Sequence, residues 1–184
     1  MAVESTMMPM TLSEIAETVG GGLVIPEGVA ATPQTVATSA VTDSREVGEA
    51  GVFVAIAGER VDGHDFVGRA AQSGAAVALV AHQVDAPMAQ IVVPDTVAAL
   101  GALAQHNIER RRALDTPFTI VGITGSVGKT TTKDMLAALL GSMGETVAPV
   151  GSFNNEIGLP LTALKVGPDT RYLVAEMGAN HVGE

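Results

Sequence analysis

The residues with the clearest chemical potential lie in one short segment, Gly125-Ser-Val-Gly-Lys-Thr130. Glycines and small residues let the N–H groups of a loop and of a following helix point at an anion, so such a segment binds phosphate. In loops of this kind the lysine reaches the β- and γ-phosphates, and the hydroxyl after it ligates Mg²⁺. We therefore predict a site for ATP and Mg²⁺, with nucleotide-binding residues Gly125, Ser126, Val127, Gly128, Lys129, Thr130 and Thr131.

The flanking sequence has the order that a phosphate-binding loop requires, which is strand, loop and helix. Apolar residues at 118–123 predict the strand, and apolar residues recurring at helical spacing over 135–143 predict an amphipathic helix. The loop departs from the common pattern, because Ile123 stands where the first glycine is usual. A glycine-rich turn that binds nothing is the alternative, but such a turn has no need of Lys129 and Thr130.

An acidic residue is expected to complete the metal site. The apolar run at 171–177 predicts a strand that ends in Glu176. Ligands of open α/β sheets collect at the carboxyl ends of the strands, where P-loop enzymes carry a second, metal-binding acid. We predict Thr130 and Glu176 as Mg²⁺ ligands, and Lys129, Thr130 and Glu176 as the catalytic groups. The alternative for Glu176 is a carboxylate that caps the next turn or pairs with a lysine.

Other polar residues are less specific on their own. Asn154 or Asn155 is suited to capping a helix that begins near Glu156. His181, taken alone, is by default an exposed loop histidine. Arg45 beside the hydroxyl of Ser44 is suited to clamping a phosphate, although a surface turn explains the pair almost as well.

Composition narrows the class of protein. The 184 residues carry a net charge of −10, and the lack of a basic footprint argues against a nucleic-acid partner. Cysteine is absent, which excludes disulfides and thiolate metal sites. The start resembles no signal peptide, and the longest wholly apolar run, residues 75–81, is too short to span a bilayer. We therefore expect a cytoplasmic protein without membrane insertion.

The elements that must position these residues predict an α/β protein with two domains. A long helix capped by Asp95 ends before Pro117, which places a boundary near residue 116. Residues 1–115 form a small α/β domain. Residues 116–184 read β-α-β-α-β, the start of a P-loop ATPase domain with a parallel sheet and crossover helices. Because three strands make an incomplete sheet, we expect a fragment of a longer protein.

Three segments, residues 122–132, 152–162 and 175–184, resemble the Mur ligases of peptidoglycan synthesis. The first domain agrees, because residues 43–45 and 62–66 resemble the UDP-binding domain of this family. The resemblance is strongest to the members that add D-alanyl-D-alanine to UDP-N-acetylmuramoyl-tripeptide. It implies that residues 1–115 bind the UDP-muramoyl peptide, and that Ile123 in the phosphate loop is a variant typical of the family.

The resemblance also implies a reaction. ATP phosphorylates the terminal carboxylate of the UDP-bound peptide, and the amine of D-alanyl-D-alanine displaces phosphate from the acyl phosphate. Asn154, Asn155 and His181 are then implied to contact the muramoyl-peptide substrate, and Ser44 and Arg45 its UDP end. The family's second metal site and C-terminal domain have no counterpart in residues 1–184, so we expect this part alone to be inactive, and we expect a monomer.

Two alternatives remain open from the sequence. One is a Mur ligase that adds a diamino acid to UDP-N-acetylmuramoyl-dipeptide. The other, from a different class, is a P-loop nucleotide-binding regulatory module that binds ATP and Mg²⁺ but no UDP-muramoyl peptide.

Overall fold

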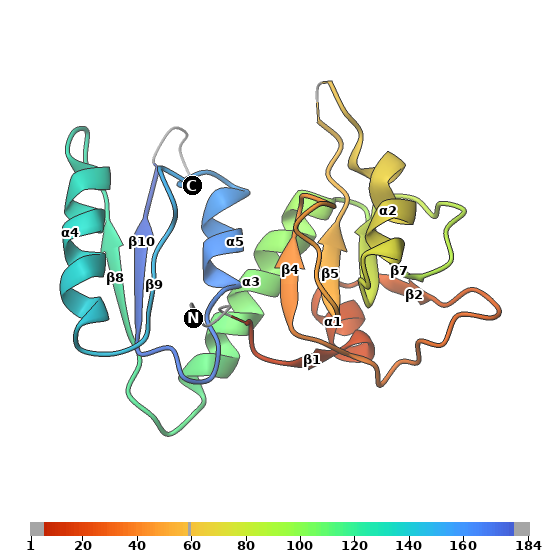
Figure 1. The fold of residues 1–184 in the computed structure, drawn as a ribbon, viewed down its shortest axis with the longest axis horizontal. Coiled ribbons are helices and arrows are strands. Elements are labelled where there is room, and N and C mark those ends of the chain that lie inside the picture. The colour runs from red at the N-terminus through yellow and green to blue at the C-terminus, as the bar shows by residue number, and fades with distance from the viewer. Residues whose placement is uncertain (1–5, 59, 179–184) are drawn as a thin grey trace. The chain divides into compact units, whose positions relative to one another are not determined.

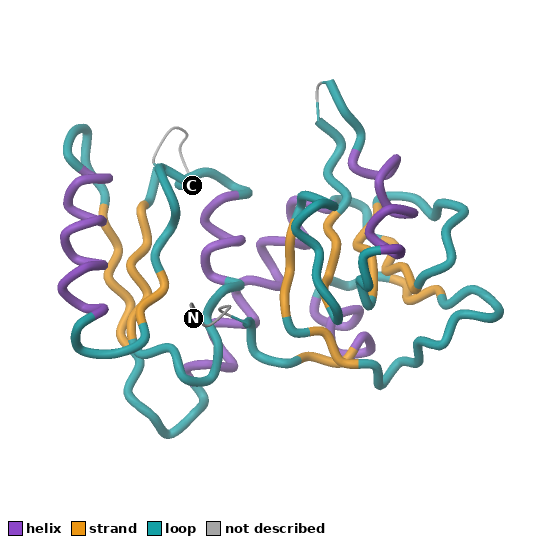
Figure 2. Tube along the Cα trace, viewed as in Figure 1, coloured by secondary structure: helices purple, strands orange, loops and turns teal. Residues whose placement is uncertain are grey.

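A computed structural model describes residues 6–58 and 60–178 (Figure 1). The chain divides into two compact units. The first is Pro9–Leu103, and the second contains residues 6–8 and the described residues from Ala104 onward. Both units combine helices with parallel strands, which confirms the predicted α/β class (Figure 2). Among the helices of the described residues, none is long and apolar enough to cross a membrane.

The first unit is built on a five-stranded sheet with the order β2-β7-β6-β5-β4. All neighbours are parallel except β2, which pairs antiparallel with β7. The strands are β2 (Gly22–Val24), β4 (Ser39–Val41), β5 (Gly51–Val54), β6 (Val77–Val80) and β7 (Ala89–Val92). Every residue of β5 and β6 is buried, as their uninterrupted apolar sequences require in a parallel sheet.

Short helices and a small ribbon complete this unit. They are β1 (Met10–Thr11), α1 (Leu12–Thr18), β3 (Val36–Ala37), the 3₁₀ helix η1 (Gly63–Phe66) and α2 (Val67–Gln72). Thr11 caps the first helix, because its hydroxyl accepts a hydrogen bond from the Glu14 N–H at 3.1 Å. Helix α3 (Thr96–Arg112) follows, and Asp95 caps it by accepting from the N–H groups of Val97 and Ala98.

The second half of α3 packs within the second unit through buried polar side chains. Asn107 donates to the carbonyls of Ala163 and Val166, and the fully buried Arg111 donates to that of Thr170 at 2.9 Å. This is why the compact units divide inside α3, whereas the sequence suggested a boundary after the helix. The division describes packing alone, and the assignment of residues 1–115 and 116–184 to two functional domains stays a prediction.

The second unit contains a parallel sheet with the order β8-β10-β9. Its elements are β8 (Thr119–Ile123), α4 (Lys129–Gly141), β9 (Thr146–Val147), α5 (Gly158–Ala163) and β10 (Tyr172–Glu176). The predicted β-α-β-α-β order is confirmed. Because β10 lies between the two earlier strands, the connections run in opposite directions, and α4 and α5 lie on opposite sides of the sheet (Figure 1).

Helix α4 differs from the amphipathic pattern of its sequence. Met135, Leu139 and Met143, which the pattern groups on one apolar face, are more than half exposed. Lys133 is instead buried, with 1% of its surface exposed. A prediction from hydrophobic periodicity places every lysine on the exposed face of a helix. It therefore cannot detect that the Lys133 amine is buried against backbone carbonyls.

Candidate functional site

The predicted phosphate loop lies between β8 and α4. Gly128, the residue that caps α4, has a φ of 82°, and Gly125 has a φ of 143°. An added Cβ would meet no atom within 4 Å at either position, so backbone conformation rather than crowding calls for glycine here. The loop therefore delivers the first N–H groups of a 13-residue helix to one point, which is a favourable site for an anion.

Lys129 is the first residue of α4, and its side chain folds back over the loop. Its Nζ atom donates to the carbonyl of Gly125 at 2.8 Å, and this contact is exposed. The amine thus already lies at the mouth of the loop, where the negative charge of a bound phosphate would accumulate.

The predicted metal ligands lie together. The Thr130 hydroxyl donates to Oε2 of Glu176 at 3.1 Å, and the amide of Asn154 donates to Oε1 at 3.0 Å. Glu176 is 1% exposed, at the carboxyl end of the buried strand β10. A hydroxyl and a carboxylate are hard oxygen ligands that fit Mg²⁺. Among the described residues, no group of three or more acidic or histidine side chains is placed to hold a metal ion, so phosphate oxygens and water would supply the other ligands.

The two neighbouring asparagines have different roles in the structure. Asn154 contacts the end of β10 twice. Its side-chain amide donates to Glu176, and its backbone carbonyl accepts from the Gly178 N–H at 3.1 Å. The side chain of Asn155 accepts from the N–H of Gly158, the first residue of α5, at 2.8 Å. The helix begins later than the predicted start near Glu156, and its N-cap residue is Ile157, which makes no side-chain capping hydrogen bond. A Cβ at Gly158 would lie 2.6 Å from the Cβ of Phe153, so this turn closes only around glycine. The substrate roles of Asn154 and Asn155 stay predictions, and His181 lies outside the described residues.

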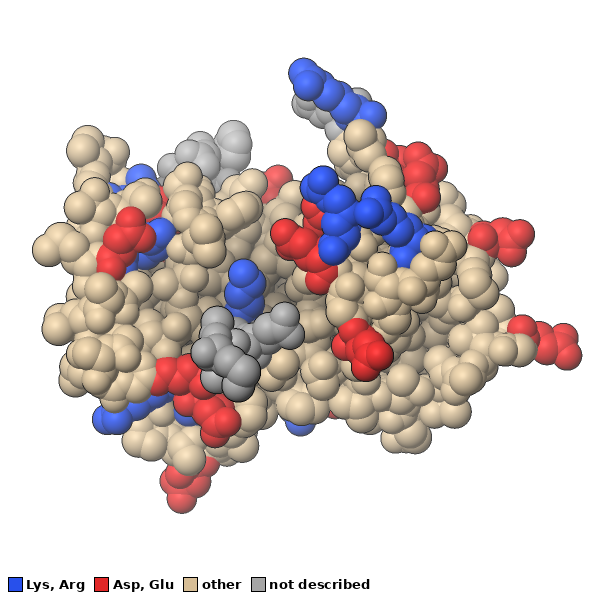
Figure 3. Space-filling view, viewed as in Figure 1, with Lys and Arg blue, Asp and Glu red and all other residues tan. Residues whose placement is uncertain are grey.

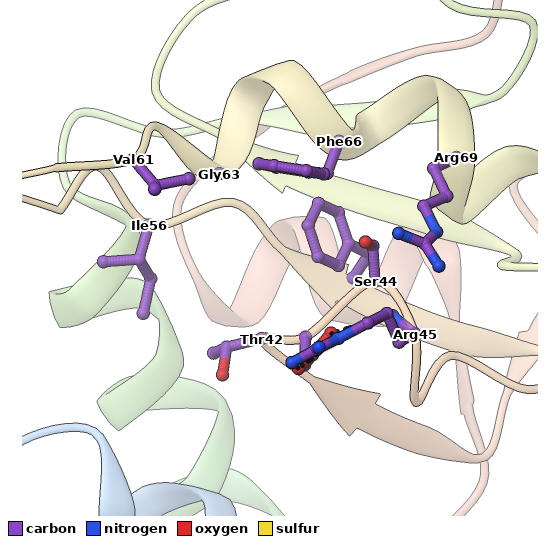
Figure 4. A pocket seen from close by; sticks show the side chains of 10 residues that line it. Thr42, Ser44, Arg45, Ile56, Val61, Gly63, Phe66 and Arg69 are labelled. Carbon is purple, nitrogen blue, oxygen red and sulfur yellow. Dashed lines mark hydrogen bonds and ion pairs between the residues drawn. The ribbon is translucent and has the colours of Figure 1, made fainter.

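The first unit contains an open pocket of about 520 Å³ (Figure 4). Its lining residues are Thr42, Asp43, Ser44, Arg45, Phe53, Ile56, Val61, Gly63, Phe66 and Arg69. Ser44 and Arg45, the predicted UDP-end residues, thus share one cavity. The sequence analysis missed Arg69, whose side chain points from α2 toward the loop of Ser44 and Arg45 (Figure 4). No sequence pattern around Arg69 marks it for this role, because only folding brings α2 beside that loop.

Arg45 forms a forked ion pair with Asp43. Its Nε lies 2.9 Å from Oδ1 and its terminal nitrogen 2.6 Å from Oδ2. The hydrogen bonds from Arg45 lower the pKa of Asp43 to about 2. On the face in Figure 3, basic side chains of this unit lie directly beside acidic ones. The Arg45 side chain remains 71% exposed, so its outer N–H groups are accessible to a ligand.

The turn before α2 is fixed by Asp62 and His64. Oδ1 of Asp62 accepts from the backbone N–H of His64 at 2.9 Å and lies 2.6 Å from its Nδ1. These hydrogen bonds lower the pKa of Asp62, the backbone contribution being the larger. Because Nε2 of His64 accepts from the N–H of Ala81, its ring proton must sit on Nδ1. The turn brings Gly63 so close to Ile56 that a Cβ would lie 2.6 Å from the Ile56 nitrogen.

A glycine loop between a parallel strand and a helix, with an acid from the adjacent strand in contact with its threonine, defines a P-loop nucleotide-binding protein. Residues 123–184 match the Mur ligase middle domain, and residues 38–108 match the catalytic domain of the Mur ligase family. The chain belongs to the Mur ligase family.

Two curated relatives of the chain are named UDP-N-acetylmuramoyl-tripeptide–D-alanyl-D-alanine ligase. The protein of Mycobacterium tuberculosis strain H37Rv is 41% identical, over 96% of this chain and 38% of its own length. That of Escherichia coli K12 is 39% identical, over 97% of this chain and 37% of its own length. The chain thus spans about two-fifths of the length of these curated relatives.

Solved structures give the same fold. A crystal structure of MurF from Acinetobacter baumannii matches with a TM-score of 0.79 and 36% identity, covering 97% of this chain and 38% of that chain. MurF ligase from Thermotoga maritima in complex with ADP matches with a TM-score of 0.65 and 37% identity, covering 79% of this chain and 33% of that chain.

Proposed function

We propose that the full-length protein is an ATP-dependent amide ligase that adds D-alanyl-D-alanine to UDP-N-acetylmuramoyl-tripeptide. The observation that carries this proposal is the contact of Thr130 with Glu176 beside the phosphate loop. The names of relatives 39–41% identical to the chain supply the substrates. The reaction belongs to the cytoplasmic synthesis of peptidoglycan precursors.

In this proposal the second unit handles the phosphates of ATP. The loop amides and Lys129 bind the β- and γ-phosphates, and Thr130 and Glu176 are the residues that would hold Mg²⁺, which when bound neutralises phosphate charge. The peptide carboxylate attacks the γ-phosphorus, and ADP leaves. The amine nitrogen of the dipeptide then attacks the acyl carbon, and inorganic phosphate leaves as the amide forms.

The first unit would bind the UDP end of the substrate. Arg45 and Arg69 at the pocket are suited to the two phosphates of a diphosphate, because guanidinium groups bind phosphate oxygens in pairs. Phe66 lines the same pocket and offers a ring surface to a base, while the buried Phe53 forms part of the pocket floor. Ser44 is buried beside them and provides a hydroxyl for hydrogen bonding.

The test is substrate choice by the full-length protein. It is incubated with ATP, Mg²⁺ and each UDP-muramoyl peptide in turn, with either D-alanyl-D-alanine or a diamino acid, and phosphate release and product mass are measured. Turnover only with the tripeptide and D-alanyl-D-alanine supports the proposal. Turnover with the dipeptide and a diamino acid supports the other Mur ligase activity. Nucleotide binding without affinity for any UDP-muramoyl peptide indicates a regulatory module.

A further inference from the structure

A buried lysine outside the phosphate loop also belongs to this region. Lys133 of α4 is 1% exposed, and its Nζ contacts the carbonyls of Pro149 at 2.9 Å and Gly151 at 2.7 Å. The carboxylate of Asp134 lies 2.9 Å from the same nitrogen. Three acceptors match the three donors of an ammonium group, which offsets the cost of burying its charge.

These contacts tie α4 to the loop between β9 and α5. Gly151 holds a left-handed φ of 67°, and its neighbour Val150 is 74% exposed. The apolar side chain of Val150 thus does little to anchor this part of the loop. Lys133 instead anchors the loop by donating hydrogen bonds to its backbone carbonyls at Pro149 and Gly151. The same loop continues directly to Asn154.

Asn154 connects this loop to the predicted metal ligand. Its amide donates to Glu176, and Glu176 in turn accepts from the hydroxyl of Thr130. Lys133 and Thr130 are three residues apart on α4, so they are neighbours on the surface of one helix. Lys133 thus connects α4 to the loop, Asn154 connects the loop to Glu176, and Glu176 contacts Thr130 of α4.

We propose that Lys133 is a positioning residue for the metal and nucleotide site. By holding the loop, it keeps the Asn154 amide on one oxygen of Glu176 and leaves the other oxygen directed at Thr130. The inference rests on the proposed function, because it assumes that Glu176 and Thr130 hold Mg²⁺. A lysine that only stabilised the fold would affect unfolding but not the linkage between Mg²⁺ and nucleotide.

The test measures ADP binding by the full-length protein, by calorimetry in Mg²⁺ and in EDTA, together with thermal unfolding. In Lys133→Met we expect the tightening of ADP binding by Mg²⁺ to fall by about tenfold, the lower end of losses seen when groups behind a metal ligand are removed. ADP affinity in EDTA should stay at the wild-type value. Asp134→Asn is the matched control, because its side chain is 67% exposed and both carbonyl contacts of Lys133 remain.

A second arm tests whether the effect passes through Asn154. If it does, the Mg²⁺-linked losses of Lys133→Met and Asn154→Ala should not add in the double variant. Additive losses, or a Lys133→Met protein with a lower melting temperature but unchanged Mg²⁺ linkage, overturn the inference. If Lys133→Met does not fold, the same measurements are made on Lys133→Gln, whose side chain is shorter and uncharged. The same results then support or overturn the inference. Wild-type protein without ligase activity contradicts the proposed function instead.

Discussion

The hydroxyl of Thr130 donates a hydrogen bond to Glu176 at 3.1 Å, although 46 positions separate the two residues. The pairing of β10 with β8 brings this about, because it sets Glu176 opposite Ile123, the last residue before the phosphate loop region. Two parallel strands thereby carry the loop and the acid to the same edge of the sheet.

We expect Glu176→Gln to impair the full-length enzyme through its metal. The amide keeps a similar shape but lacks the charge that attracts Mg²⁺, so kcat should fall at least about tenfold and more Mg²⁺ should be needed for half-maximal rate. Steady-state rates over a Mg²⁺ series measure both effects. Glu145→Gln is the control, since Glu145 accepts from Thr170 rather than from any residue of the phosphate loop. An unchanged Mg²⁺ requirement contradicts the metal role.

Lys129→Ala should abolish turnover, because Lys129 is the one charged side chain of residues 125–131 and would bind the γ-phosphate directly. A kcat within tenfold of wild type, a loss below about 1.4 kcal/mol, would show that the phosphate-loop assignment is wrong. Single-turnover measurements with saturating ATP separate this loss from weaker binding. Lys165→Ala, at an exposed lysine beyond α5, should retain normal kcat.

Gly63→Ala should destabilise the first unit. The new Cβ would lie 2.6 Å from the nitrogen and 2.8 Å from the oxygen of Ile56, and rigid backbone atoms cannot yield as a flexible side chain can. We expect the free energy of unfolding to drop by about 1–3 kcal/mol, the usual cost of overpacking. Gly68→Ala is matched to it, because a Cβ there meets nothing within 4 Å. Chemical denaturation should show no loss for Gly68→Ala, and equal stability of both variants would contradict the crowding.

The ion pair of Asp43 with Arg45 should show a defined pH dependence. The pKa of Asp43 is lowered from 3.8 to about 2, so the contribution of the pair is fully present above pH 3.8 and is lost as pH falls through 2. Arg45→Ala should move the midpoint of Asp43 back toward 3.8, as followed by the carboxyl chemical shift in NMR. Arg69→Ala should move it much less, because Arg69 acts only through its charge. Equal shifts in the two variants would refute this cause.

The sequence predicted the order of strands and helices in the second unit and the position of its phosphate loop. It did not predict which polar side chains are buried inside the unit. Glycines, Lys129 and Thr130 are recognisable because their chemistry depends on neighbours in the chain, and the strand before Glu176 is recognisable by its apolar run. Lys133 and Arg111 were not predicted as buried, because most of their partners are backbone carbonyls, which cannot be recognised from residue types. The pocket residue Arg69 was missed for a related reason, since only folding brings α2 beside the loop of Ser44.

The register of β10 has a consequence for which sequence changes this chain can accept. Exchange of one apolar side chain for another within Tyr172–Ala175 alters packing and leaves Glu176 in place. Loss or gain of a single residue in this strand would reverse the alternation of side chains and turn the carboxylate to the opposite face. The length of this strand is therefore under tighter constraint than its composition, and insertions that the surface loops tolerate should be excluded here.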